Sequence, residues 1–154
     1  MKRIVALFNI LAIFLVAAFT GSVLAGATQE TVTISTSKPL GPGLGTFSAS
    51  GAVSDSGTLV TVGRHFSAIP APQHLVTHLV LRFEGSQGTF TIRTQIIETP
   101  TEDPAVFTDE GVWAIVDGTD GYSGLHGTGI VVGTVDDIAN LITRVFNGTI
   151  HFSQ

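Results

Sequence analysis

Side-chain polarity alternates at every second residue in segment after segment between Glu30 and the carboxyl end of the chain. Leu79, Leu81 and Phe83, for example, occupy every second position of one such segment. Successive side chains of an extended strand point to opposite faces, so a period of two indicates strands with one buried face. No segment shows a convincing helical period. The sequence therefore predicts an all-β protein.

Eight extended segments are separated by Gly, Pro, Asp and Ser, at a spacing typical of an all-β sandwich or barrel. The expected strands are residues 30–35, 45–54, 58–68, 74–84, 89–98, 106–117, 126–135 and 143–152. Proline donates no ladder hydrogen bond, so the proline-containing stretches 38–43, 69–72 and 99–104 are expected to be loops at strand boundaries. One helical turn is expected at residues 136–141.

One hairpin can be placed in register from its faces. If residues 85–88 form a four-residue loop, Glu84 lies opposite Thr89. The remaining cross-strand pairs are then Phe83–Phe90, Leu81–Ile92, Leu79–Thr94, Arg82–Thr91, Val80–Arg93 and His78–Gln95. A shift by one residue would set Phe83 and Leu81 among polar partners, so burial selects this register.

Consecutive strands are expected to pair with their neighbours, which leaves two sheet edges unless the sheet closes on itself. A second turn, at residues 54–57, joins two strands in the same way, and Gly57 is expected to need a positive φ there. We therefore expect a single closed antiparallel β-barrel of about eight strands, formed by residues 28–154.

A hydrophobic leader precedes the barrel. Lys2 and Arg3 are followed by no charged residue up to residue 27, and Val23 and Ala25 occupy the −3 and −1 positions of a signal peptidase site. We expect residues 1–27 to be a cleaved signal peptide and the protein to be secreted or periplasmic. The alternative is an uncleaved membrane anchor, since residues 4–19 approach the length of a spanning helix. Small residues follow the apolar stretch, and no basic residue follows it as a stop-transfer signal. These features favour cleavage.

The mature chain is acidic and has no cysteine. Cleavage removes two basic residues, which leaves 5 basic and 12 acidic residues and changes the formal net charge from −5 to −7. Such a surface repels phosphate, and the basic residues are scattered singly, so we expect no nucleic-acid partner. Without disulfides the fold must be held by burial alone, which its length permits.

Residues 118–129 read GTDGYSGLHGTG and lie between a strand that contains Trp113 and a Val-rich strand. This run resembles the G-T-x-x-Y-x-G-L-x-G-x-G segment of bacterial proteins with an allene oxide cyclase-like or dirigent-like barrel, and residues 45–47 and 146–152 fit the same pattern. The resemblance implies an eight-stranded antiparallel barrel. In plant members it also implies stereochemical control of a cyclisation or radical coupling inside the cavity. No catalytic residue of the family is matched to a position in this chain.

The same residues have a structural interpretation of their own. Gly127, Gly129 and Gly133 share one face of their strand, which would let a bulky neighbour such as Trp113 lie across it. Tyr122 and Leu125, in the preceding turn, would plug one end of the barrel.

Polar residues on one face of the central hairpin are the main candidates for a binding site. If His78, Arg82, Arg93 and Gln95 line the lumen, they offer cations and a general acid or base, with Glu110 as counter-charge. In the alternative, which we favour, the apolar face fills the interior and this polar face meets water. The full set of candidate ligand-binding residues is His78, Arg82, Arg93, Gln95, Glu110, Trp113 and Tyr122.

Other groups of His and acidic residues are weaker candidates for a functional site. His74 and His78 lie on one face of a strand but roughly 13 Å apart, too far to ligate one metal ion. The adjacent carboxylates at 102–103, 109–110 and 136–137 would point to opposite faces of a strand, and we interpret them as solvated acidic loops. No catalytic motif and no need for a metal or other cofactor is apparent.

Three functional hypotheses follow. The first is a secreted module that binds a small apolar ligand or a partner; the second is a cyclase, isomerase or dirigent-like enzyme that steers a reactive substrate within the barrel. The third is a structural role. A cavity of a few hundred Å³ with aromatic walls would support the first two, and one that holds both a cation and a carboxylate would favour the enzyme. The sequence indicates no membrane association after cleavage and leaves a homo-oligomer open.

Overall fold

The computed structural model of the chain describes residues 28–69 and 74–153. The predicted signal peptide, residues 1–27, lies outside the described residues, as do the prolines of the loop expected at residues 69–72. In the described part of the chain, no helix has the length and hydrophobicity needed to span a membrane.

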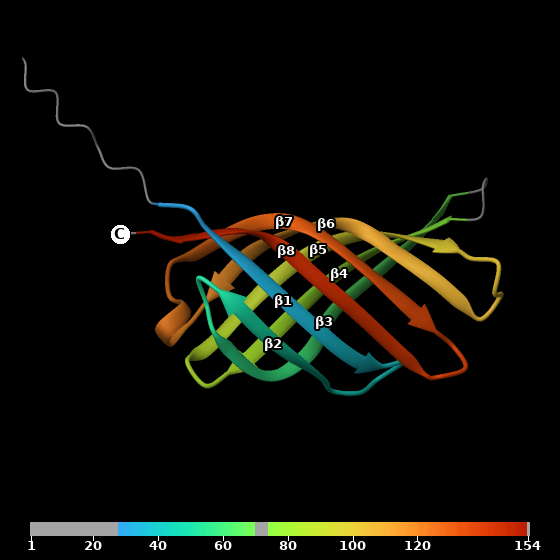
Figure 1. The fold of residues 1–154 in the computed structure, drawn as a ribbon, viewed down its shortest axis with the longest axis horizontal. Coiled ribbons are helices and arrows are strands. Elements are labelled where there is room, and N and C mark those ends of the chain that lie inside the picture. The colour runs from blue at the N-terminus through green and yellow to red at the C-terminus, as the bar shows by residue number, and fades with distance from the viewer. Residues whose placement is uncertain (1–27, 70–73, 154) are drawn as a thin grey trace, which may run out of the picture.

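Eight antiparallel strands form one closed barrel, so the predicted fold class is confirmed (Figure 1). Each strand pairs with its neighbours in sequence, and β1 closes the barrel by pairing with β8. The strands are β1 (Glu30–Pro39), β2 (Gly45–Gly51), β3 (Asp55–Ile69), β4 (His74–Gly85), β5 (Gly88–Pro100), β6 (Val106–Gly118), β7 (Leu125–Asp136) and β8 (Leu141–Phe152). One short 3-10 helix, η1 (Asp120–Tyr122), connects β6 to β7.

The β4–β5 hairpin has the predicted register. Glu84 pairs with Thr89, and the six other predicted pairs, from Phe83–Phe90 to His78–Gln95, are all present. The turn is shorter than expected, because Gly85 and Gly88 pair with each other and only Ser86 and Gln87 lie between the strands.

Two predicted turns are wrong in detail. Gly57 has no positive φ; Gly51 adopts it instead, at 98°, where β2 ends. Gly57 is required for a different reason, since a Cβ there would lie 2.0 Å from the carbonyl oxygen of Glu84. Residues 136–141 do not form a helical turn but a tight β7–β8 connection with Asn140 at φ 54°.

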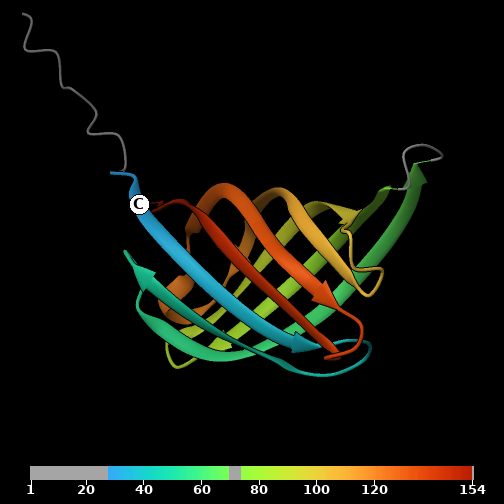
Figure 2. The same cartoon turned by 45° about the vertical axis from the view of Figure 1, so that its right-hand side comes forward.

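One half of the barrel interior is filled by apolar side chains. Phe83 stacks on Phe90 at 4.7 Å between ring centroids, and Phe47 meets both rings edge-on. A cavity among these side chains has a volume of about 10 Å³, which leaves room for about one water molecule at most. This end of the barrel, on the left in Figures 1 and 2, is thus packed by apolar side chains in its interior.

Tyr122 closes the same end, as predicted. Its side chain and that of Leu125 are buried, and its hydroxyl donates a 2.6 Å hydrogen bond to Asp55 Oδ2. Burial raises the pKa of Tyr122, and the hydrogen bond to Asp55 raises it further. Burial alone would also raise the pKa of Asp55, but hydrogen bonds from Tyr122, Ser86 and Ser56 hold it well below its ordinary value of 3.8. One carboxylate thus ties η1 to the β4–β5 turn and the start of β3.

Trp113 lies across glycines, also as predicted. Gly129 is its partner on β7, and Gly148 is the partner of Gly129 on β8. A Cβ on Gly148 would lie 2.6 Å from the indole ring. The indole Nε1 donates hydrogen bonds to the carbonyl oxygens of Ile130 and Asn147, at 3.0 and 3.3 Å, so the one polar atom of this buried ring is satisfied.

Candidate functional site

A buried ion pair lies in the other half of the barrel. Arg144 on β8 donates from Nε to Oδ2 of Asp109 on β6 at 2.7 Å, and its Nη2 lies 2.7 Å from the same oxygen. The two side chains are 8 % and 0 % exposed. Taking charges out of water costs several kcal/mol per ion, and an apolar pair of similar volume would often be more stable here. The pair is therefore a candidate functional feature of the barrel.

Gly133 makes room for this pair. It lies between the two charged residues in one row across the sheet, since Asp109 pairs with Gly133 and Gly133 pairs with Arg144. A Cβ on Gly133 would lie 2.7 Å from Arg144 Cγ. The arginine side chain thus passes over the glycine to reach Asp109, just as Trp113, further along β6, lies across Gly129 and Gly148.

The second oxygen of Asp109 is unsatisfied. Oδ1 is buried and has no hydrogen-bond partner among the described residues. Burial raises the pKa of this carboxyl; the Arg144 charge opposes that shift, and the Glu98 charge adds to it, so that the pKa lies above its ordinary value. A buried acceptor without a donor is destabilising. Oδ1 is therefore the atom at which a proton or a ligand donor would be favoured.

An open cavity of about 220 Å³ lies above the pair at the end of the barrel. It is lined by Leu40, Arg64, Phe66, Leu75, Thr77, Leu79, Glu98, Phe107, Val135, Asp137, Ile142 and Arg144. Asp109 follows Phe107 by two positions on β6, so it shares the inward face directly below the cavity wall. This end, on the right in Figures 1 and 2, is where the β5–β6 and β7–β8 connections project.

Further charges lie in and near the cavity wall. Lys38, which is not part of the wall, is buried and donates from Nζ to the carbonyl oxygens of Pro39 and Gly41. Burial lowers its pKa, and the nearby charges of Arg64 and Arg144 lower it further. The Arg64 guanidinium lies over the Phe66 ring at 5.2 Å, and Glu98 accepts a 2.6 Å hydrogen bond from Thr77. Cations and carboxyl groups therefore converge on one cavity with aromatic walls.

The predicted site residues lie elsewhere. His78, Arg82, Arg93, Gln95 and Glu110 are exposed on the outside of the barrel, and Phe83, Leu81, Phe90 and Ile92 fill the interior. The favoured orientation of this hairpin is thus confirmed. Trp113 and Tyr122 are buried in the core. That these seven residues bind a ligand stays a prediction.

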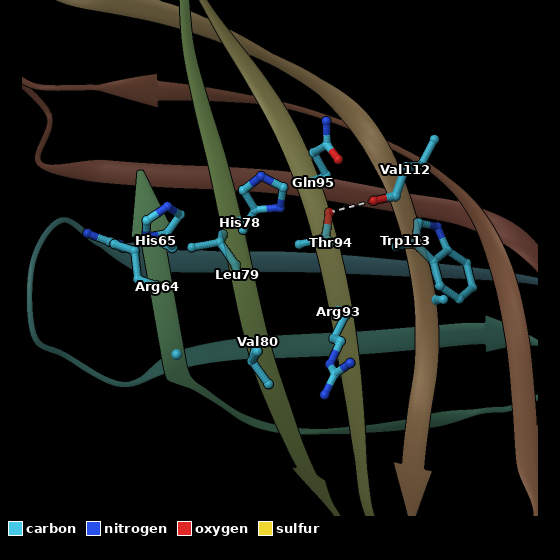
Figure 3. A pocket seen from close by; sticks show the side chains of 12 residues that line it. Arg64, His65, His78, Leu79, Val80, Arg93, Thr94, Gln95, Val112 and Trp113 are labelled. Atoms are coloured by element: carbon cyan, nitrogen blue, oxygen red, sulfur yellow. Dashed lines mark hydrogen bonds between the residues drawn. The ribbon is translucent and has the colours of Figure 1, made fainter. Parts of the chain in front are cut away.

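Four of the seven line a single hollow on the outer wall, shown in Figure 3 and called the outer trough below. It crosses β3, β4, β5 and β6 and has a volume of about 460 Å³. Its lining is Gly63, Arg64, His65, His78, Leu79, Val80, Arg93, Thr94, Gln95, Val112, Trp113 and Ala114. Arg82, Glu110 and Tyr122 are not part of it, and Arg82 is paired with Glu84 at 2.7 Å.

The charges inside the barrel were not predicted from the sequence. Asp109 was expected in a solvated acidic loop with Glu110, and that interpretation is wrong: Asp109 is 1 % exposed, and only Glu110 meets water. A signal was present in the sequence. Asp109 is four residues from Trp113, and Arg144 is two residues from Phe146. Residues an even number of positions apart on a strand share a face, so the sequence puts both charged residues on apolar faces.

Comparisons with models of known protein families, with curated proteins and with solved structures give no match. Within residues 28–69 and 74–153, no group of three or more His, Asp or Glu side chains is arranged to hold a metal ion. The functional inference for this chain therefore depends on the geometry of its own residues.

Proposed function

We propose that this protein is a ligand-binding barrel whose open end holds a small molecule with an apolar body and a polar head group. The observation that carries the proposal is the buried Asp109–Arg144 pair beneath the open cavity, with Asp109 Oδ1 left without a donor among the described residues. Arg144 belongs to the cavity wall and Asp109 lies behind it, so a ligand would meet Arg144 first. A ligand hydroxyl or amine that reached Oδ1 after a shift of these side chains would relieve the unsatisfied acceptor.

The walls of the cavity suggest the rest of the ligand. Phe66, Phe107 and Val135 offer an apolar surface, and Arg144 retains N–H donors beyond the two that it uses for Asp109. A volume of about 220 Å³ is below the usual range for a drug-sized ligand, so the polar head would be enclosed and the apolar body would extend over the rim.

A second candidate function is that of a cyclase, isomerase or dirigent-like enzyme. The observation in its favour is that Arg144, which lines the cavity, is paired with a buried carboxyl group of raised pKa, that of Asp109. In that case Asp109 would act as the general acid, and Arg144 would position an anionic or carbonyl oxygen of the substrate. The barrel wall would exclude water from a reactive intermediate.

Secretion and family membership are part of the proposal and stay predictions. Export would follow from the predicted signal peptide at residues 1–27. Barrels of eight strands occur in unrelated protein classes, so the resemblance to allene oxide cyclase-like and dirigent-like proteins rests on residues 118–129 rather than on the fold.

Native mass spectrometry of protein purified gently from its own host tests ligand binding. We expect an added mass on the wild-type protein and on Glu110→Gln, which changes the outward neighbour of Asp109. The double variant Asp109→Leu/Arg144→Met replaces the pair by apolar side chains and should lose the added mass while it remains folded. An unmodified wild-type mass, or equal retention by the double variant, would overturn the proposal.

The same material separates binding from catalysis. The compound extracted from the complex is incubated with fresh wild-type protein and with Asp109→Asn, and both are analysed by chromatography. A new retention time that appears with the wild-type protein alone would support the enzyme. An unchanged compound in both samples would leave simple binding as the function.

A further inference from the structure

We infer that the outer trough is a second binding site, which takes an elongated aromatic or apolar molecule with a carboxylate or sulfonate at one end. This site lies on the outside of β3–β6 (Figure 3). Arg64 and Leu79 belong to its lining and also to that of the cavity at the open end, and the other lining residues of the two hollows differ. Its volume of about 460 Å³ falls within the range of small-molecule sites.

Small residues create the hollow. Gly63 lies where the pairing of β3 with β4 shifts by one residue, and its partner is Val80. A Cβ on Gly63 would lie 3.3 Å from the Val80 side chain, so a larger residue would fill the trough from this side. Ala114 occupies the corresponding outward position on β6, opposite Arg93. Val80 and Val112 supply the apolar sides.

Arg93 supplies an uncompensated positive charge. The other arginines of the described chain have partners: Arg82 pairs with Glu84, Arg144 pairs with Asp109, and Arg64 stacks on Phe66. Among the described residues no carboxylate lies within 4.0 Å of Arg93, and the trough lining contains no Asp or Glu. In a chain of net charge −5, an acid-free hollow with a free guanidinium attracts an anion, which Arg can bind with two parallel hydrogen bonds.

A second polar group lies at a fixed distance from Arg93. Gln95 is two residues further along β5, and His78 is its partner on β4, so both belong to the next outward-facing row. His65 pairs with His78, with ring centroids 6.2 Å apart. Rows two residues apart on a strand are separated by roughly 7 Å. The trough therefore fits a ligand whose anion meets Arg93 and whose hydrogen-bonding group, about that far away, meets Gln95 and His78.

A suitable probe is 6-(p-toluidino)naphthalene-2-sulfonate, which carries a sulfonate at one end of an elongated aromatic body and fluoresces when it leaves water. We expect the wild-type protein to bind it, with an affinity that falls as salt is added. Arg93→Gln should raise the Kd at least about tenfold and remove most of the salt dependence. Gly63→Val should raise it similarly by filling the hollow without a change of charge.

Two control variants distinguish binding in the trough from a general charge effect and from binding at the open end of the barrel. Arg82→Gln removes a cation from the same outer wall but outside the trough, and its Kd should stay within about twofold of wild type. The double variant Asp109→Leu/Arg144→Met alters the open end and should bind the probe with the Kd of wild type. Failure of the proposed trough site can therefore be distinguished from failure of the proposed site at the open end. A wild-type Kd for Arg93→Gln or for a folded Gly63→Val, or an equal loss in Arg82→Gln, would overturn the inference.

Discussion

Gly133 lies directly beneath the side chain of Arg144, where a Cβ would stand 2.7 Å from Arg144 Cγ. The row Asp109–Gly133–Arg144 spans three neighbouring strands, and its central residue has no side chain to obstruct the other two. A single glycine thus sets the path by which the arginine reaches the carboxylate. The arginine side chain uses space that a side chain at residue 133 would occupy.

Substitution of Gly133 by Ala should destabilise the protein by about 1–3 kcal/mol, because the added methyl group would lie 2.2 Å from the carbonyl oxygen of Thr143 and 2.7 Å from Arg144 Cγ. Urea unfolding followed by circular dichroism measures the change. Thr128→Ala, an exposed outward position on the same strand, serves as the control and should stay within about 0.5 kcal/mol of wild type. Equal stability of Gly133→Ala and wild type would show that the pair does not need this clearance.

Asp109→Leu should cost about 3–5 kcal/mol, because it leaves Arg144 as a buried charge without its acceptor. The double variant Asp109→Leu/Arg144→Met should recover most or all of that loss, since it removes both charges together. Chemical denaturation of the three proteins gives the comparison. If the double variant is as unstable as Asp109→Leu, the pair is required for folding, and its functional interpretation fails.

The fold was predictable because burial alone determines it. The alternation of Leu79, Leu81 and Phe83 fixes which face of β4 is buried. Matching that face to the apolar face of β5 gives the observed register, because a shift by one residue would set apolar side chains opposite polar ones. The turns were less predictable, since each depends on the dihedral angles of one or two residues. Gly51 rather than Gly57 adopts the positive φ, and nothing in the local sequence distinguishes them.

The candidate site was harder to predict, because its members are distant in sequence. Asp109 and Arg144 are 35 residues apart and meet only through the combined registers of β6, β7 and β8. The alternation of side chains along each strand does place Asp109 and Arg144 on inward faces. An adjacent acid, Glu110, suggested a solvated loop instead, and composition alone could not distinguish a buried carboxyl group from an exposed one.

Tyr122→Phe should destabilise the barrel by about 1.5–3 kcal/mol, because it removes a hydrogen bond to a charged group at the closed end. The phenyl ring would keep its edge-on contact with Phe90, so packing is preserved and the loss reports the hydroxyl. Thermal and urea unfolding measure it, with Phe152→Leu, an exposed aromatic residue at the end of β8, as the control. A stability equal to wild type would show that Asp55 is satisfied by its remaining partners.

Acid should weaken the closed end through Asp55. The folded-state pKa of this carboxyl lies below its ordinary value of 3.8, so its contribution to stability is fully present above that value. The contribution is lost progressively as the pH falls below about 4 toward the folded-state pKa, because the unfolded chain takes up the proton first. Asp109, whose folded-state pKa is raised, acts in the opposite direction: its contribution is present at low pH and is lost as the pH rises. Urea midpoints of wild type and Asp55→Asn, measured between about pH 6 and pH 2.5, separate the two groups. Asp55→Asn should show a smaller loss of stability on acidification than wild type, whereas parallel curves would mean that another carboxyl group is responsible.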